Sequence, residues 1–270
     1  MPEPSFKSLH PLSESRLKKR CALQQKKYRD LEKTFLAEGL RLCEDALSGD
    51  MSVQEVIVTE SALCDERVLA LVQAADKTGL PIYLASQRQF NKLSEEKSPQ
   101  GVVFVMQKRQ RSISQHTFGH LILACDHIQD PGNLGTILRT AEWFGVKEVL
   151  LSSGCVDVYN PKVVRSAMGA LFRVRIFDHT DFMHVLPQFK KTGYRLVGAT
   201  ADAPRDLSEI QSTIKDVLLV GNEAHGLSLA LSPYIDLFVS IPGRARGESL
   251  NVASATAILL YHFSQLKSDK

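Results

Sequence analysis

The sequence has no uninterrupted apolar run near the roughly 20 residues that a membrane-spanning helix needs. Its opening, MPEPSFKSLH, lacks the apolar stretch behind a basic segment that marks a secretory signal. The five cysteines are odd in number and widely scattered, with no C-x-x-C pair and no zinc-like spacing. These absences predict free thiols, no membrane partner and no bound metal, in the cytoplasm or an organelle of similar redox state.

Two glycine-rich nucleotide motifs are also missing. Neither G-x-G-x-x-G nor G-x-x-x-x-G-K-[ST] occurs, so a standard dinucleotide or nucleoside triphosphate site is not indicated. The composition is otherwise that of a globular protein, because 44% of the 270 residues are hydrophobic and 23% are charged. This length is enough for one or two domains that fold without disulfides or a metal.

Basic residues are concentrated near the start of the chain, although the net charge is only +3. A basic cluster of this kind can contact phosphates, and a solvated helix face is an equally good interpretation. The residues of this cluster that we expect to contact phosphates are Lys18, Lys19, Arg20, Lys26, Lys27 and Arg29.

The front part of the chain alternates helical and strand patterns. Over 31–48, apolar residues recur at helical spacing up to Gly49, which predicts a helix. A second helix is expected over 62–78, and strands over QEVIVT, PIYLA and GVVFVM. These elements predict a small α/β unit of about 100 residues.

A polar, basic stretch over 107–120 looks like a linker, and a second unit follows it. Near-continuous apolar strands alternate there with amphipathic helices, which predicts a parallel sheet covered on both faces. The expected strands are LILACD, KEVLLS, RVRIF, RLVGAT, DVLLVG and LFVSIP, and the expected helices cover 134–145, 160–171, 181–191 and 249–266.

Three loops that follow expected strands carry polar residues without an obvious packing role, at the sheet edge where such folds bind ligands. They cover 127–135, 221–228 and 241–251. Arg139 follows the first loop, and it could hold a phosphate or pair with Glu142. In the other two loops a tight turn at 221–228, or capping of the last helix by Ser249, would explain the same residues.

Together these loops resemble the motifs of the SpoU/TrmH family of RNA ribose methyltransferases, within the SPOUT superfamily. NLGTILRTA at 133–141 resembles the first motif, and LLVGNEAHGLS at 218–228 resembles the second. IP at 241–242 with SLNVASATA at 249–257 resembles the third. KKYR and FLAEGLRL, within 26–42, are similar to the family's substrate-binding domain, so the resemblance covers nearly the whole chain.

The resemblance implies a fold and a domain order. The methyltransferase domain over 119–270 would be an α/β fold with a parallel sheet, helices on both faces and a C-terminal trefoil knot. A basic extension over 1–30 would precede a ribosomal-protein-like, RNA-binding α/β domain over 31–107 and a linker over 108–118. A homodimer through the knotted domain is also expected.

The resemblance implies methyl transfer from S-adenosylmethionine to a ribose 2′-hydroxyl, without a metal. Arg139 would clamp the target phosphate and stabilise developing charge, because a guanidinium holds its proton too tightly to be an easy base. By family position the catalytic residues would be Arg139, Asn133, Glu223, Asn251 and Ser249. The cofactor would lie near Leu219, Val220, Gly221, Asn222, Gly226, Ile241 and Leu250. Arg244 and Arg246 would face RNA or solvent.

The target is expected to be ribosomal RNA of the 23S type, because the front domain resembles those of large-subunit enzymes. A transfer RNA ribose methyltransferase, a base methyltransferase and a non-catalytic RNA-binding relative stay open as alternatives. An unrelated nucleotide-using enzyme is disfavoured by the missing glycine motifs. The single tryptophan, Trp143, is expected to pack rather than to stack on a base.

Overall fold

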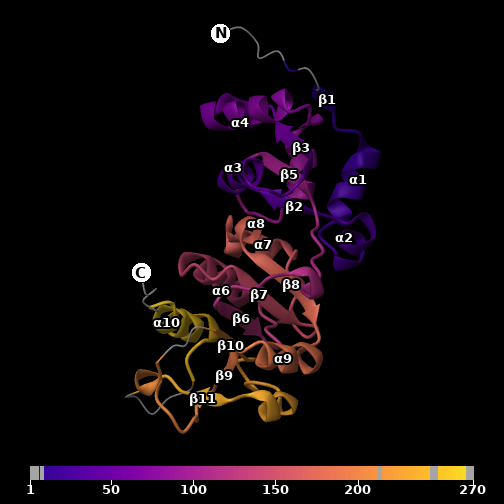
Figure 1. Cartoon of the computed structure of the whole chain (residues 1–270). Helices are drawn as coiled ribbons and strands as arrows, with labels where there is room; N and C mark the ends of the chain where they lie inside the picture. The colour runs from indigo at the N-terminus through magenta and orange to yellow at the C-terminus, as the bar shows by residue number, and fades with distance from the viewer. Residues whose placement is uncertain (1–5, 7–8, 212–214, 244–248, 266–270) are drawn as a thin grey trace. The chain divides into compact units, whose positions relative to one another are not determined.

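The computed structural model describes residues 6, 9–211, 215–243 and 249–265 (Figure 1). Internal contacts divide the chain into two compact units. The first comprises Met1–Arg109 and Tyr159–Phe172, and the second comprises Gln110–Val158 and Arg173–Lys270. The segment 159–172 therefore packs within the first unit, although it lies inside the predicted 119–270 domain. The predicted borders of 1–30, 31–107, 108–118 and 119–270 stay predictions.

The first unit contains a five-stranded mixed sheet in the order β1-β4-β3-β5-β2. β1, β4 and β3 are parallel, whereas β5 is antiparallel to both of its neighbours. The strands are β1 (Leu9–Pro11), β2 (Thr34–Glu38), β3 (Val53–Thr59), β4 (Ile82–Ala85) and β5 (Val102–Gln107). The three strands expected in this part of the chain are thus confirmed.

Short helices surround this sheet. α1 packs against α5, and α7, from the later segment of the chain, packs against β2. The helices are α1 (Glu14–Ala22), α2 (Lys26–Glu32), α3 (Leu40–Ser48), α4 (Glu66–Lys77), α5 (Gln87–Leu93), α7 (Pro161–Ala167) and α8 (Ala170–Arg173). The short 3₁₀ helix η1 (Ala62–Cys64) precedes α4, so the helix expected over 62–78 is present in two parts.

The helix predicted over 31–48 is wrong in its first half, which forms β2. Lys33 adopts a left-handed conformation (φ 55°) that ends α2, and Gly39 (φ 104°) separates β2 from α3. From Phe35 onward, the buried Phe35 and Ala37 alternate with the partly exposed Leu36 and Glu38, as one sheet face requires. The apolar residues of this strand and of the helix after it therefore had the spacing of one long helix.

The second unit contains a six-stranded, wholly parallel sheet in the order β11-β9-β10-β6-β7-β8. This confirms the expected parallel sheet. The strands are β6 (Leu121–Cys125), β7 (Glu148–Ser152), β8 (Arg175–Thr180), β9 (Arg195–Ala199), β10 (Asp216–Val220) and β11 (Leu237–Val239).

Helices cover both faces of this sheet, with α9 (Phe182–Lys191) on one side and α6 (Pro131–Trp143) and α10 (Val252–Ser264) on the other (Figure 1). α9 buries Leu186 and Phe189 against strand residues such as Ile122. α6 and α10 pack against each other. Three 3₁₀ helices, η2 (Ile113–Gln115), η3 (Leu207–Glu209) and η4 (Leu229–Tyr234), complete the unit. No helix in the described ranges is long and apolar enough to cross a membrane.

The expected packing of Trp143 is wrong, because its side chain is 83% exposed at the end of α6. The buried stripe of α6 instead consists of Leu134, Ile137, Leu138 and Ala141. Trp143 lies two positions beyond Ala141, a rotation of about 200° that places it on the opposite face of the helix.

Candidate functional site

The three unusual loops meet at the carboxyl edge of the parallel sheet. Asn133, in the first turn of α6, donates its amide to Glu223 in the loop after β10. Asn251, at the start of α10, donates from Nδ2 to Asn133 Oδ1 at 3.1 Å. One side chain from each sequence motif therefore joins a single hydrogen-bonded chain. We call Asn133, Glu223 and Asn251 the polar trio.

Helix capping holds two members of the trio, Asn133 and Asn251, in place. Asp130 caps α6 by accepting from Asn133 N at 2.8 Å, and Pro131 occupies the first turn. Asn251 caps α10 by accepting from Ala253 N at 2.9 Å, so the alternative that Ser249 serves only as the cap is wrong. Two helix N-termini thus converge on the trio, and the positive ends of their dipoles favour negative charge there.

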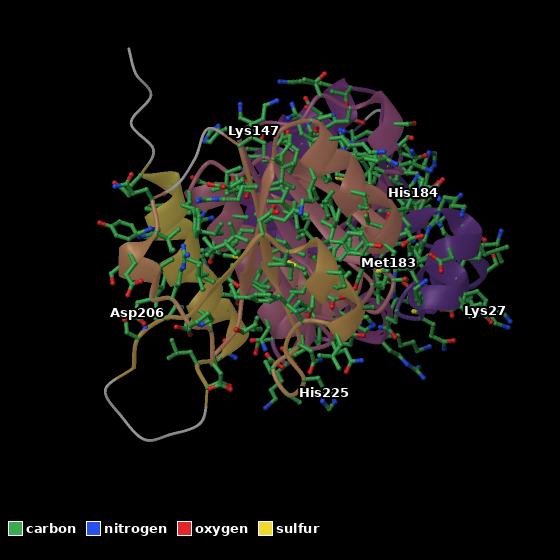
Figure 2. The ribbon with its side chains drawn as sticks, turned by 60° about the horizontal axis from the view of Figure 1, so that its bottom comes forward. Lys27, Lys147, Met183, His184, Asp206 and His225 are labelled. Atoms are coloured by element: carbon green, nitrogen blue, oxygen red, sulfur yellow. The ribbon has the colours of Figure 1, made fainter. Side chains whose placement is uncertain are left out.

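The loop after β10 is closed on itself. Asn222 N donates to Gly226 O at 2.9 Å, and Gly226 N donates back to Asn222 O at 2.8 Å. The Asn222 side chain accepts from Ala224 N at 2.9 Å and donates to His127 O at 2.9 Å. Asn222 therefore organises the loop, and Figure 2 shows His225 at its outer end.

Gly221 lies where this loop leaves the sheet, and no side chain fits there. A Cβ would be 2.2 Å from the Gly226 carbonyl carbon. Gly221 is itself buried, yet no hydrogen bond to its N–H or C=O occurs within the described parts of the chain. Because buried backbone groups are almost always paired, these two groups are suited to a ligand.

Sequence reasoning missed the loop after β9. β9 lies between β10 and β11, so its carboxyl end shares the edge with Gly221 and Ile241. Thr200 N donates to Val239 O at 3.0 Å, and Ser240 N donates to Arg205 O at 2.9 Å. The signal was the polar run after RLVGAT, but only the strand order shows that it reaches this edge.

A buried carboxylate, Asp126, lies directly after the end of β6 and bonds Ser228 in the loop after β10. Burial alone would raise its pKa, but hydrogen bonds from Ser228 and His127 outweigh burial and lower the pKa of the carboxyl. Oδ2 accepts from Ser228 N at 2.9 Å and from Ser228 Oγ at 2.6 Å, and Oδ1 lies 2.6 Å from His127 Nδ1. Asp126 is therefore held in its charged form.

Two of the predicted catalytic residues stand apart from the polar trio. Arg139 is exposed on α6, and no hydrogen bond or ion pair to it occurs within the described ranges. The alternative pairing with Glu142 is wrong, because Glu142 bonds Arg173. Ser249 is exposed and, within the same ranges, has no hydrogen bond. Arg139 is thus available to a phosphate.

The predicted cofactor residues differ in how accessible they are to a ligand. Leu219 is fully buried in the core, and Val220 O accepts from Asp126 N at 2.8 Å, so neither presents a free group to the edge. Ile241 is partly exposed after β11, and Leu250 is 52% exposed before α10. Gly221 and these two residues remain the best placed for a ligand.

The basic cluster of the first unit separates into structural and exposed residues. Arg29 is only 2% exposed and donates to Leu23 O and Gln24 O, each at 2.8 Å. Arg20 bonds the buried Glu55 at 2.6 Å. Lys26 pairs with Asp30, whereas Lys18, Lys19 and Lys27 are exposed. We call these last three the exposed lysine group.

Further cations lie beside this group, and others fall outside the described ranges. α1 packs against α5, which carries the exposed Arg88 and Lys92. Sequence reasoning missed these two because they are distant along the chain. Arg244 and Arg246 lie outside the described residues. Among the described residues no group of three or more potential metal ligands occurs, and the absence of a metal stays a prediction.

Comparisons with known proteins agree on one family. Residues 120–261 match the SpoU rRNA Methylase family, and residues 14–103 match the MRM3-like substrate binding domain. The 23S rRNA (guanosine(2553)-2′-O)-methyltransferase RlmP of Bacillus subtilis is 31% identical, over 95% of this chain and 99% of its own length.

Two solved structures resemble the chain over nearly its full length. A putative RNA methyltransferase of the TrmH family from Porphyromonas gingivalis has a TM-score of 0.82 and 31% identity, covering 94% of this chain and 98% of its own. An AdoMet-bound rRNA methyltransferase from Sinorhizobium meliloti has a TM-score of 0.84 and 28% identity, covering 95% and 97%.

Proposed function

This chain belongs to the SpoU rRNA methylase family, and we propose that it transfers a methyl group from S-adenosylmethionine to a ribose 2′-hydroxyl of ribosomal RNA. The observation that carries the proposal is the polar trio, which joins one residue of each family motif at one edge of the sheet. The relative from Bacillus subtilis, named for 2′-O-methylation of 23S rRNA, supports that RNA class over transfer RNA. A cytoplasmic location belongs to the same proposal.

The cofactor pocket would be the edge formed by Gly221, Ile241 and Leu250, with the end of β9 between them. The unpaired backbone groups of buried Gly221 fit a ligand held through the main chain. The AdoMet-bound relative supports the choice of S-adenosylmethionine. When bound, that cofactor supplies a methyl group activated by the sulfonium.

Positioning would account for much of the catalysis, because displacement at a methyl carbon must be in line. Asn133, held by Glu223 and Asn251, would orient the ribose. Arg139 would hold the adjacent phosphate bidentately and stabilise the charge that develops on the 2′-oxygen. The exposed guanidinium suits this role, because nothing in the described ranges competes for it.

The first unit would bind RNA through the exposed lysine group together with Arg88 and Lys92. These five side chains are exposed on α1, α2 and α5, and α1 packs directly on α5. Lysines distributed in this way contact phosphates without reading the base sequence. Arg20 and Arg29, in contrast, have structural partners and are not part of this proposal.

A homodimer through α6 and α10 completes the proposal. Four large apolar side chains are exposed on these helices and just before α10, which is unusual for a surface that faces water. They are Trp143, Leu250, Ile258 and Tyr261.

A C-terminal trefoil knot is also part of the proposal. Hydrogen bonds between the segment after β11 and the loop after β9 support it, such as the bond that Leu207 N donates to Ser240 O at 2.8 Å.

The direct test is incubation of the purified chain with S-adenosylmethionine labelled in the methyl group and with deproteinised 23S rRNA. We expect label in the RNA, and nuclease digestion should yield a 2′-O-methylated nucleoside. Label on a base would identify a base methyltransferase instead. RNA binding without transfer, also when ribosomal particles replace free RNA, would favour the non-catalytic relative.

A further inference from the structure

His127, in the loop after β6, connects three loops at the carboxyl edge of the sheet. Its backbone is left-handed (φ 55°), so that its N–H and C=O reach different neighbours. The N–H donates to Ser152 Oγ at 3.0 Å, at the end of β7, and the C=O accepts from Asn222 Nδ2 at 2.9 Å, after β10. The imidazole lies over Gly154, where a Cβ would be 2.1 Å from His127 Cδ2.

Asp126 forms a second connection between the loops after β6 and β10. Its carboxylate is 2% exposed and accepts both the N–H and the hydroxyl of Ser228. His127 Nδ1 occupies the other carboxylate oxygen. A buried carboxylate with these donors resists separation, because separation would leave a buried charge unsatisfied.

These two connections lie on either side of the part of the loop that carries Glu223. Asn222 is tied to His127 just before Glu223, and Ser228 is tied to Asp126 just after Gly226. The hydrogen bonds between Asn222 and Gly226 fix the internal shape of the loop, but they do not fix where it sits. Within the described ranges Glu223 bonds only Asn133, so its position depends on the two connections.

We propose that Asp126, His127 and Ser228 are positioning residues for methyl transfer, which hold the closed loop 221–226 where Glu223 meets Asn133. This inference rests on the proposed function and assigns a task to residues outside the polar trio. Gly221 follows the last residue of β10 directly, so the strand fixes its position. The position of Glu223 therefore depends more on Ser228 than the position of the cofactor edge does. Loss of the Ser228 hydroxyl should therefore slow turnover more than it weakens cofactor binding.

The test compares Ser228→Ala with Ser228→Thr, which keeps the hydroxyl, and with Ser232→Ala as a matched control. Ser232 lies in η4 and is exposed, and its hydroxyl has no hydrogen bond within the described ranges. We expect Ser228→Ala to lower kcat at least about tenfold, because small displacements of positioned groups are costly. The cofactor Kd should stay within about threefold of wild type, and Ser228→Thr should restore most of kcat.

Hydrogen exchange followed by mass spectrometry gives a readout that does not depend on activity. In Ser228→Ala the amides of 221–229 should exchange faster, while the strands of the sheet keep wild-type protection. An active wild type with unchanged kcat in Ser228→Ala would overturn the inference and leave the proposed function standing. An inactive wild type would refute the proposed function, and unchanged exchange in Ser228→Ala would then overturn the loop-holding role as well.

Discussion

Replacing Gly221 by alanine should disrupt the cofactor edge without unfolding the sheet. The new Cβ would lie 2.2 Å from the Gly226 carbonyl carbon and 2.4 Å from Leu227 N. Both are backbone atoms, so side-chain rotation cannot relieve the overlap and the loop must open. Opening breaks the two hydrogen bonds between Asn222 and Gly226. At about 0.5–1.5 kcal/mol each, their loss amounts to about 1–3 kcal/mol, or roughly 5- to 150-fold in cofactor Kd.

Calorimetric titration with S-adenosylmethionine measures this change. Gly226→Ala is the comparison, because no atom lies within 4 Å of its Cβ position although its φ is +65°. Backbone strain alone, at about 1–2 kcal/mol, should weaken binding there by no more than about 5- to 30-fold. Wild-type affinity in Gly221→Ala, in a protein with an unchanged thermal midpoint, would show that cofactor binding does not depend on the closed loop.

Four further predictions concern other parts of the chain. Arg29→Ala should lower the free energy of unfolding by about 2–4 kcal/mol in urea titrations, because one buried and one partly buried carbonyl lose their charged donor; a change under about 0.5 kcal/mol would contradict it. Hydrogen bonds from Lys108 and Lys26 lower the pKa of Asp30 from the ordinary 3.8 to about 2. These bonds therefore stabilise the folded state fully above pH 3.8, and the stabilisation is lost as the pH falls toward 2. Asp30→Asn should remove this pH dependence, and an unchanged acid unfolding profile would argue against it. Substituting all of the exposed lysine group by alanine should reduce the slope of log K for RNA against log salt by about 2; an unchanged slope would place RNA elsewhere. Trp143→Glu should convert a dimer to a monomer in sedimentation velocity, and an unaltered sedimentation coefficient would exclude that surface.

The strands and the motif loops of the second unit were predictable from the sequence. Buried parallel strands are continuous apolar runs, and the polar loops after them stand out against that background. Asn133, Glu223 and Asn251 were all named from the motifs, and the structure brings them together. The hydrogen bonds among these three residues could not be predicted, because they depend on the order of the strands in the sheet and no local sequence pattern gives that order.

The remaining discrepancies come from signals that are ambiguous along the chain. The strand Thr34–Glu38 followed by the helix Leu40–Ser48 kept a helical apolar spacing across Gly39. Arg29 counted as a surface cation because its backbone partners come from the turn before α2. Trp143 was expected to pack rather than to stack on a base, but its position on the helix turns it outward.

The proposed role of Arg139 is tested most directly by single-turnover methyl transfer to 23S rRNA by the wild type and by Arg139→Ala, with the cofactor Kd measured on both. We expect a 2′-O-methylated product from the wild type. We also expect a loss of transfer in Arg139→Ala of at least about 100-fold, with cofactor affinity nearly unchanged. Undiminished transfer by Arg139→Ala would exclude this role.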